Sequence, residues 1–180
     1  MGNIVCKFGG TSVADEKQIR KIERIIRSDS RRRFIVPSAP GKSSEYDTKI
    51  TDLLYSCYDR TNNGGDISEP FNIIRQRYTD IAMSLCPELD IAQLLDELKQ
   101  SIENGASRDY VASRGEYLCG KIIAALLAAN FIDPVDGILL SDDGRLDRQS
   151  YERLGELLNG DGLFVIPGFY GYNKIFQASL

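Results

Sequence analysis

The chain has 180 residues, of which 42% are hydrophobic and 27% charged, and its formal net charge is −4. This length and composition are typical of one folded, water-soluble domain rather than of a disordered or fibrous protein. Nucleic-acid binding is not expected, because the basic run Arg31 to Arg33 leads directly into an apolar stretch. No run of about 18 apolar residues is present, so the sequence predicts no membrane span.

The cysteine pattern and the absence of histidine limit the chemistry of the chain. The cysteines are Cys6, Cys57, Cys86 and Cys119. No two of them form a CxxC pair, and the adjacent acids Asp142 and Asp143 are more typical of a solvated turn, so we predict no metal site. No basic leader precedes the apolar residues Ile4 to Cys6, and we expect a cytoplasmic protein with reduced thiols. Acid–base chemistry without histidine would have to use carboxylates or lysine.

The N-terminal part of the chain predicts a β-α-β unit. Residues 4–8 are apolar and indicate a buried strand, which the glycine turn at 9–12 follows. Apolar residues then recur at helical spacing over about 15–28, and residues 34–36 predict the next strand. Such a crossover favours parallel strands, so we expect an α/β fold with a mainly parallel sheet covered by helices on both faces.

The middle of the chain predicts an all-helical insertion. A polar loop precedes a helix that opens at Thr51, and two amphipathic helices follow over about 70–85 and 90–103. Ser68 is placed to cap the first of these two. A longer helix is predicted over about 107–130. Its second half is apolar around most of its circumference, so it should be buried at the centre of the fold.

The last third returns to an alternation of strand and helix patterns. Strands are predicted at 138–140 and 163–166, with a helix at about 149–158 between them. Residues 172–180 have the pattern of a hairpin arm. No internal repeat or low-complexity linker divides the chain, which favours one domain or part of one.

Lys7 ends the first predicted strand, and Gly9 and Gly10 follow it before the predicted helix. Glycines without Cβ allow backbone N–H groups to converge on phosphate oxygens, and a helix N-terminus adds a favourable dipole. A lysine at this place can offset the charge of a transferring phosphoryl group. The short Lys-x-Gly-Gly pattern alone is more often a tight strand–helix turn with a solvated lysine.

Five segments, taken in chain order, carry a resemblance to one family. They are Lys7–Ala14, Val36–Lys42, Thr51–Leu54, Ser113–Glu116 and Ile166–Gly171. These segments resemble the motifs of aspartokinases, which have the amino-acid kinase fold. The resemblance implies a three-layer αβα fold with a helical insertion. It also implies that residues 1–180 are the N-terminal, amino-acid-binding part of that domain, without the nucleotide-binding half and the regulatory domains.

The resemblance also implies roles for individual residues. Lys7 would be catalytic, and the phosphates would be bound by Lys7, Gly9, Gly10 and Thr11. The amino-acid substrate would be bound by Ser38, Thr51, Glu116, Gly168 and Phe169. Glu116 would hold the substrate ammonium group, because a carboxylate accepts charge-assisted hydrogen bonds.

Each of these polar side chains also has a purely structural interpretation. Thr51 would then be a helix N-cap, Ser38 a turn residue, and Glu116 a solvated acid paired with Arg114 or Lys121. Pro37 stands where the family commonly has valine, and a proline there indicates an edge or strand-terminal position.

The implied reaction is ATP-dependent phosphorylation of the L-aspartate side-chain carboxylate to 4-phospho-L-aspartate, the first step toward lysine, threonine and methionine. Phosphoryl transfer mainly requires positioning, Mg²⁺ and cationic stabilisation, so a site without histidine is acceptable. The segment expected to hold ATP is missing, so this chain alone should be inactive and bind neither ATP nor Mg²⁺ tightly. Apolar surface left exposed would favour homo-oligomers.

Other classes of function stay open at this point. The chain could be a non-catalytic module that binds an amino acid, or a structural fragment without a ligand. A kinase of the same fold acting on glutamate, carbamate or a nucleotide is disfavoured by the Gly-Gly-Thr-Ser-Val and Ser-Arg-Gly-Glu segments.

Overall fold

The computed structural model describes residues 2–45, 47–141 and 143–173. In chain order the elements are β1 (Ile4–Phe8), the 3-10 helix η1 (Gly10–Val13), α1 (Glu16–Arg27), β2 (Arg32–Pro37), α2 (Ile50–Asn62), α3 (Ser68–Leu85), α4 (Ile91–Glu103), α5 (Arg108–Leu127), β3 (Asn130–Phe131), α6 (Pro134–Gly137), β4 (Leu139–Leu140), α7 (Gln149–Leu157), β5 (Phe164–Val165) and β6 (Tyr172–Asn173). Asp142 and most of the predicted hairpin arm lie outside the described residues.

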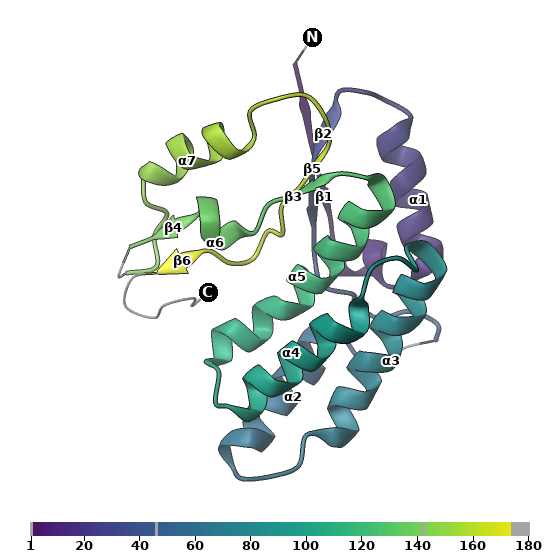
Figure 1. The fold of residues 1–180 in the computed structure, drawn as a ribbon, viewed down its shortest axis with the longest axis vertical. Helices are drawn as coiled ribbons and strands as arrows, with labels where there is room; N and C mark the ends of the chain where they lie inside the picture. The colour runs from purple at the N-terminus through teal and green to yellow at the C-terminus, as the bar shows by residue number, and fades with distance from the viewer. Residues whose placement is uncertain (1, 46, 142, 174–180) are drawn as a thin grey trace.

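The main sheet has four parallel strands in the order β1-β2-β5-β3. The predicted β-α-β unit is present, because β1 and β2 pair in parallel and α1 connects them. Pro37 is the last residue of β2, which confirms its predicted strand-terminal position. The α/β architecture with a mainly parallel sheet, packed helices and a helical insertion is therefore confirmed (Figure 1).

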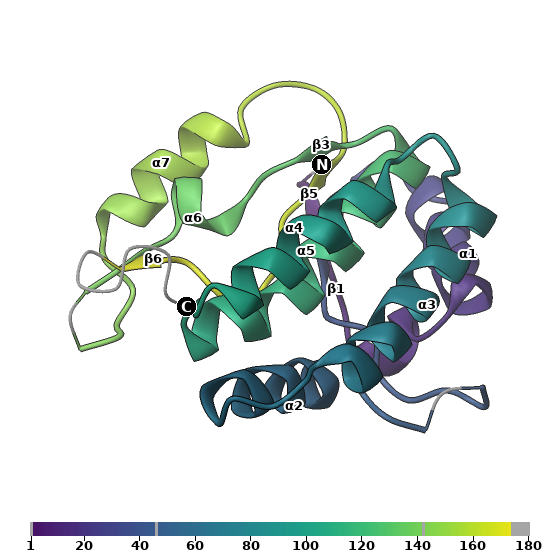
Figure 2. The ribbon, with the colours of Figure 1, turned by 60° about the horizontal axis from the view of Figure 1, so that its bottom comes forward.

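Alternating side chains of the sheet strands point to opposite faces. On one face, Ile35 and Val165 are fully buried in the main core cluster, which also contains residues of α1 and α5. On the other face, the rings of Phe34 and Phe164 stack with centroids 5.7 Å apart, and the Arg33 guanidinium lies over both. Helices α1 and α7 lie on opposite sides of the four-stranded sheet in both views (Figures 1 and 2).

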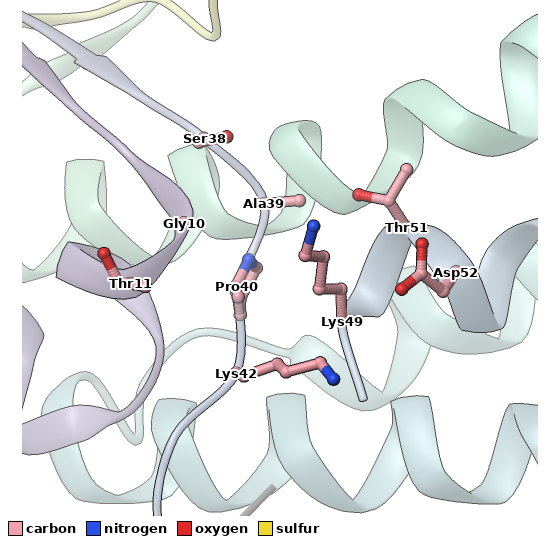
Figure 3. Close-up of a pocket in the computed structure, with 10 residues that line it drawn as sticks. Gly10, Thr11, Ser38, Ala39, Pro40, Lys42, Lys49, Thr51 and Asp52 are labelled. Atoms are coloured by element: carbon pink, nitrogen blue, oxygen red, sulfur yellow. The ribbon is translucent and has the colours of Figure 1, made fainter. Parts of the chain in front are cut away.

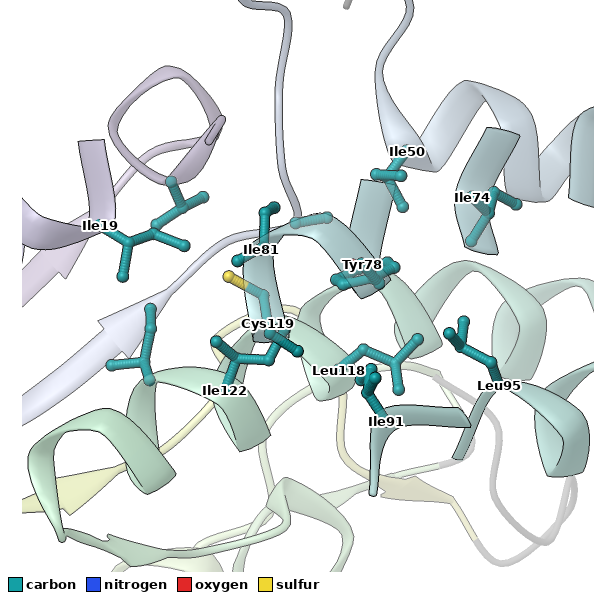
Figure 4. Packing of buried hydrophobic residues seen from close by; sticks show 14 of the residues in the cluster. Ile19, Ile50, Ile74, Tyr78, Ile81, Ile91, Leu95, Leu118, Cys119 and Ile122 are labelled. Carbon is teal, nitrogen blue, oxygen red and sulfur yellow. The ribbon is translucent and has the colours of Figure 1, made fainter. Parts of the chain in front are cut away.

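Helix α5 is the centre of the helical part, as predicted. It contacts α2, α3 and α4 as well as strands of the main sheet, and its Leu118, Cys119 and Ile122 are buried against the neighbouring helices (Figure 4). Tyr78 of α3 is fully buried, and its hydroxyl donates a hydrogen bond to the Gly115 carbonyl of α5 at 2.6 Å. The insertion is therefore packed as one unit with the helix that follows it.

Two local predictions were wrong. Ser68 does not cap α3; its backbone N–H and hydroxyl both donate to the Asp66 carboxylate, and the N-cap is Ile67. The predicted long helix ends at Leu127, because Ala128 adopts the left-handed conformation, with φ of 52°. Asn130 and Phe131 form β3 instead. Glycine is the usual signal for such a helix end, and alanine gives none.

The predicted strand at 138–140 forms outside the main sheet. Its β4 pairs in parallel with β6 to make a separate two-stranded sheet.

None of the described helices is both long and apolar enough to cross a membrane.

Candidate functional site

The loops after β1 and β2 meet at the carboxyl ends of these parallel strands. The Ser38 N–H donates to the Phe8 carbonyl at 3.0 Å, and the Gly41 N–H donates to the Gly10 carbonyl at 2.8 Å. A Cβ on Gly41 would lie only 2.7 Å from the carbonyl carbon of Gly10. Glycine at 41 is therefore required so that the two backbones can touch.

A pocket of about 530 Å³ opens at this junction (Figure 3). It is lined by Gly10, Thr11, Ser38, Ala39, Pro40, Gly41, Lys42, Lys49, Thr51 and Asp52. Its walls come from three segments, namely η1, the loop after β2 and the first turn of α2. The structure thus brings together four residues predicted from the family resemblance: Gly10, Thr11, Ser38 and Thr51.

Thr51 does not act as a helix cap. Helix α2 begins at Ile50, its N-cap is Lys49, and no side chain caps it. Thr51 lies in the first turn, and its half-buried side chain lines the pocket (Figure 3). The structural interpretation of Thr51 as an N-cap is therefore wrong.

Glu116 of α5 joins the pocket through Ser38, whose hydroxyl donates to the Glu116 Oε1 at 3.1 Å. The Glu116 Oε2 is buried and accepts no hydrogen bond of good geometry among the described residues, although the backbone N–H groups of Ala39 and Gly168 lie near the carboxylate. Burial raises the pKa of this carboxyl above its usual value, while Ser38, Lys7 and the backbone of Ala39 and Gly168 partly counter the rise. Lys7, Ser38 and Gly168 therefore gather around one half-buried acid.

The structural interpretation of Glu116 as a solvated, paired acid is wrong. The Arg114 guanidinium stacks on the rings of Tyr110 and Tyr117, at 4.6 and 4.4 Å from their centroids. The Lys121 ammonium lies 4.2 Å from the centroid of the Phe131 ring. Neither cation forms an ion pair with Glu116 within the described part of the chain.

Gly115 explains why the Ser-Arg-Gly-Glu segment can deliver Glu116 to this place. A Cβ on Gly115 would lie 2.9 Å from the Ala39 Cβ and 3.1 Å from the Ile50 Cγ2. Both distances are shorter than ordinary van der Waals contact. The missing side chain lets α5 approach the loop after β2 closely enough for Glu116 to reach Ser38.

The two remaining substrate-binding candidates differ in their positions. A Cβ on Gly168 would lie 2.5 Å from the Val36 Cγ1, so this turn packs tightly on the end of β2. The Phe169 side chain is 56% exposed and does not line the pocket. Gly168 is thus held beside Glu116, whereas the Phe169 ring is turned outward.

The phosphate-binding candidates lie at the same edge of the sheet. Lys7 is exposed, and its charge acts on the Glu116 carboxylate. Gly9 is exposed too, and no described atom lies within 4 Å of where its Cβ would be. Open space beside backbone amides suits the oxygens of an anionic ligand.

Some pocket residues were missed by the sequence analysis. Lys42, Lys49 and Asp52 line the pocket, but charged residues in a polar loop and a first helical turn are usually solvated. Arg77 is fully buried beneath the pocket loops. Its signal was present in the sequence, because Arg77 falls on the apolar face of its helix, between Ile74 and Ile81.

A metal site is not formed by the described residues alone. They contain no group of three or more histidine, cysteine, aspartate or glutamate residues that could hold a metal ion, and Asp52 is the one carboxylate that lines the pocket. The donors at the pocket are hydroxyls, amides and ammonium groups. This set suits the oxygens of an anionic ligand.

Comparisons with known proteins agree with this geometry. Residues 3–176 match the model of the amino acid kinase family. Aspartokinase 3 of Bacillus subtilis is 34% identical over 94% of this chain and 41% of its own length, and the aspartokinase of Chlamydia muridarum is 27% identical over 93% and 39%. The chain therefore spans about two fifths of the length of these relatives.

Solved structures show the same likeness. The aspartate kinase of Clostridium acetobutylicum superposes with a TM-score of 0.94 and 47% identity, over 98% of this chain and 41% of that one. Aspartokinase III of E. coli, solved in complex with aspartate and ADP, superposes with a TM-score of 0.81 and 25% identity, over 98% and 43%.

Proposed function

We propose, since the chain belongs to the amino acid kinase family, that it forms the amino-acid-binding part of an aspartate kinase. In this proposal residues 1–180 hold L-aspartate, and the nucleotide-binding half and regulatory domains belong to the rest of a longer protein. The complete enzyme would phosphorylate the aspartate side-chain carboxylate with ATP and Mg²⁺. This chain alone would bind neither ATP nor Mg²⁺ tightly and would be inactive.

The observation that carries the proposal is the carboxylate of Glu116. Its Oε1 accepts from Ser38, and its buried Oε2 has no hydrogen-bond partner among the described residues. A buried carboxylate oxygen without a partner costs free energy that a ligand ammonium group would recover. The pocket hydroxyls of Ser38 and Thr51 and the ammonium of Lys49 are suited to the carboxylates of the same ligand.

In the proposed reaction, a side-chain carboxylate oxygen of aspartate attacks the γ-phosphorus of ATP. One P–O bond forms, and the bond to the leaving ADP oxygen breaks. Lys7 and the amides of Gly9, Gly10 and Thr11 would stabilise the charge on the transferring phosphoryl group. Most of the rate enhancement would come from positioning and electrostatics, so no histidine is needed.

Calorimetric titration of the 180-residue chain with L-aspartate tests the proposal, with L-glutamate and magnesium-ATP as comparators. We expect heat from aspartate, weaker heat from glutamate, and none from magnesium-ATP. Heat from magnesium-ATP would show that the nucleotide site lies within this chain. Failure of all three ligands would contradict the assignment of a self-sufficient aspartate site to these residues.

The two pocket lysines supply a second prediction. Lys42 and Lys49 are exposed, come from different segments, and form no ion pair within the described chain. Replacing Lys49 by Gln should weaken aspartate binding about twofold to fivefold, and Lys42→Gln should act in the same direction. The loss should shrink in high salt, because exposed charges are screened.

Lys21→Gln on α1 is the matched control, because the Lys21 ammonium contacts Gln18 and does not line the pocket. It should leave the dissociation constant for aspartate unchanged. An equal loss in all three variants would mean that only the overall charge of the protein matters.

The proposal also includes a homo-oligomeric state and a cytoplasmic location. Large apolar side chains stay exposed on several elements, among them Val5 at 66% and Tyr151 at 69%. Apolar side chains favour association where they form one continuous exposed patch, which is what this part of the proposal requires of them. Sedimentation equilibrium measures the oligomeric state directly, and a monomer at all concentrations would contradict this part of the proposal.

A further inference from the structure

Arg77 is a fully buried arginine on α3, and the neighbouring buried positions of that helix, Ile74, Tyr78 and Ile81, are apolar or aromatic. Arginine is almost never fully buried unless its donors are satisfied, because removing a guanidinium from water carries a large desolvation cost. A leucine or methionine would fill the same space without this cost. The presence of arginine here therefore calls for a specific explanation.

The guanidinium of Arg77 binds three backbone carbonyls, one directly after η1 and two in the loop that joins β2 to α2. Its Nη1 donates to the Thr48 carbonyl at 3.0 Å, and its Nη2 donates to the carbonyls of Ala14, at 2.8 Å, and Gly41. A planar guanidinium has five N–H donors in a fixed geometry, so one side chain can hold several acceptors at once. An apolar residue has no donor, and the three donors of a lysine ammonium all lie on one nitrogen atom.

Each of these carbonyls belongs to a residue that lines the pocket or directly adjoins a segment that does. Ala14 directly follows η1, which supplies Gly10 and Thr11. Gly41 itself lines the pocket, and Thr48 directly precedes Lys49, the N-cap of α2. One buried side chain thus connects all three walls from below.

Gly41 directly precedes Lys42, and Thr48 directly precedes Lys49. The hydrogen bonds from Arg77 to the carbonyls of Gly41 and Thr48 therefore fix the backbone next to both pocket lysines. Without the guanidinium, all three carbonyls would lose a buried donor. They would have to rearrange toward water, and the walls would be joined only by their remaining backbone hydrogen bonds.

We propose that Arg77 is a positioning residue for the amino-acid pocket, which holds η1, the loop after β2 and the start of α2 in one arrangement. Its role is to preorganise the binding groups, and it does not touch the ligand. The identity of the ligand in this inference rests on the proposed function. The role of Arg77 in holding the three segments together does not.

The test compares Arg77→Met with Ile74→Ala, both on the buried face of α3. Ile74 is fully buried and does not contact the pocket loops through hydrogen bonds, so its truncation destabilises the helical core without removing the donors. Hydrogen–deuterium exchange is measured for residues 9–15 and 38–51, and the dissociation constant for L-aspartate is measured well below the melting temperature. Arg77→Lys serves as a second variant if Arg77→Met does not fold.

In Arg77→Met, we expect the two pocket segments to exchange about tenfold faster than in Ile74→Ala at matched thermal stability. Aspartate binding should weaken about tenfold to a hundredfold in Arg77→Met and stay close to wild type in Ile74→Ala. Arg77→Lys should fall between wild type and Arg77→Met, because an ammonium reaches fewer carbonyls.

Equal exchange and equal affinity in Arg77→Met and Ile74→Ala would overturn the inference and leave Arg77 as a core residue only. If the wild-type chain binds no aspartate, the proposed function of this chain fails. The exchange comparison then decides the role of Arg77 by itself.

Discussion

Replacing Glu116 by Gln is expected to weaken aspartate binding about tenfold to a hundredfold, which corresponds to the ~1.5–3 kcal/mol of a hydrogen bond to a charged group. The Ser38 hydroxyl can still donate to the amide oxygen of Gln, so the local geometry should survive. What is lost is the negative charge, and one acceptor oxygen becomes an N–H donor that repels an ammonium. Calorimetric titration with L-aspartate measures the loss.

The same substitution should make the folded protein more stable at neutral pH. Burial raises the pKa of the Glu116 carboxyl in the folded state, so the folded protein holds this proton more tightly than the unfolded chain does. The free energy of unfolding therefore falls as the pH rises from the unfolded pKa through the folded pKa. Glutamine avoids this cost. The melting temperature of Glu116→Gln should exceed that of wild type above this window, and the difference should disappear below it.

Glu152→Gln is the matched control, because Glu152 is exposed, belongs to α7 and does not line the pocket. It should change neither affinity nor the pH dependence of melting. Wild-type affinity in Glu116→Gln would show that the ammonium group of aspartate binds elsewhere. A lower melting temperature at neutral pH would contradict the stated cost of the buried charge.

Gly41→Ala is expected to destabilise the protein by about 2–3 kcal/mol, at the upper end of the range for overpacking, and to abolish measurable aspartate binding. The new Cβ would lie 2.7 Å from the carbonyl carbon of Gly10 and 3.0 Å from the Thr11 nitrogen. These are backbone atoms, so they cannot move aside as the end of a side chain can. The loops after β1 and β2 would separate, and the pocket would lose its shape because both loops line it. Urea unfolding measures the loss of stability.

Gly155→Ala provides the contrast for Gly41→Ala. Gly155 lies inside α7, and no described atom is within 4 Å of its Cβ position. Alanine should therefore stabilise the protein by about 0.5–1 kcal/mol, since glycine is unfavourable in a helix interior. If Gly41→Ala unfolds at the same urea concentration as wild type, the close approach of the two loops is not required.

The elements with strong local patterns were predicted well. Residues 4–8 form β1 as predicted, and α1 and α5 occupy most of their predicted ranges. Periodicity is a local property, so it is visible in one sequence. The two-residue strands β3 and β4 are too short for a period. Their pairing depends on partners far along the chain, since Asn130 pairs with Phe164 and Leu139 with Tyr172.

The family resemblance named four of the residues that line the pocket, and their binding roles stay predictions. Gly10, Thr11, Ser38 and Thr51 line the pocket, and Glu116 is bonded to Ser38. The sequence could not show that Gly41 and Gly115 are required by contacts with Gly10 and Ala39. Those requirements come from backbone approaches between segments that are distant in the chain.

The sequence by itself determined that this is an α/β domain of the amino acid kinase family, because strand and helix periods and the glycine-containing motifs are local signals. Only the tertiary structure decided how the site is organised. It placed the half-buried Glu116 beside Ser38, brought Lys42 and Lys49 to one pocket, and buried Arg77 against three carbonyls of the segments around that pocket. The physical reason is that desolvation and hydrogen-bond partners depend on the neighbours in space. The identity of a charged residue in the sequence therefore does not show whether it is solvated or buried in the folded protein.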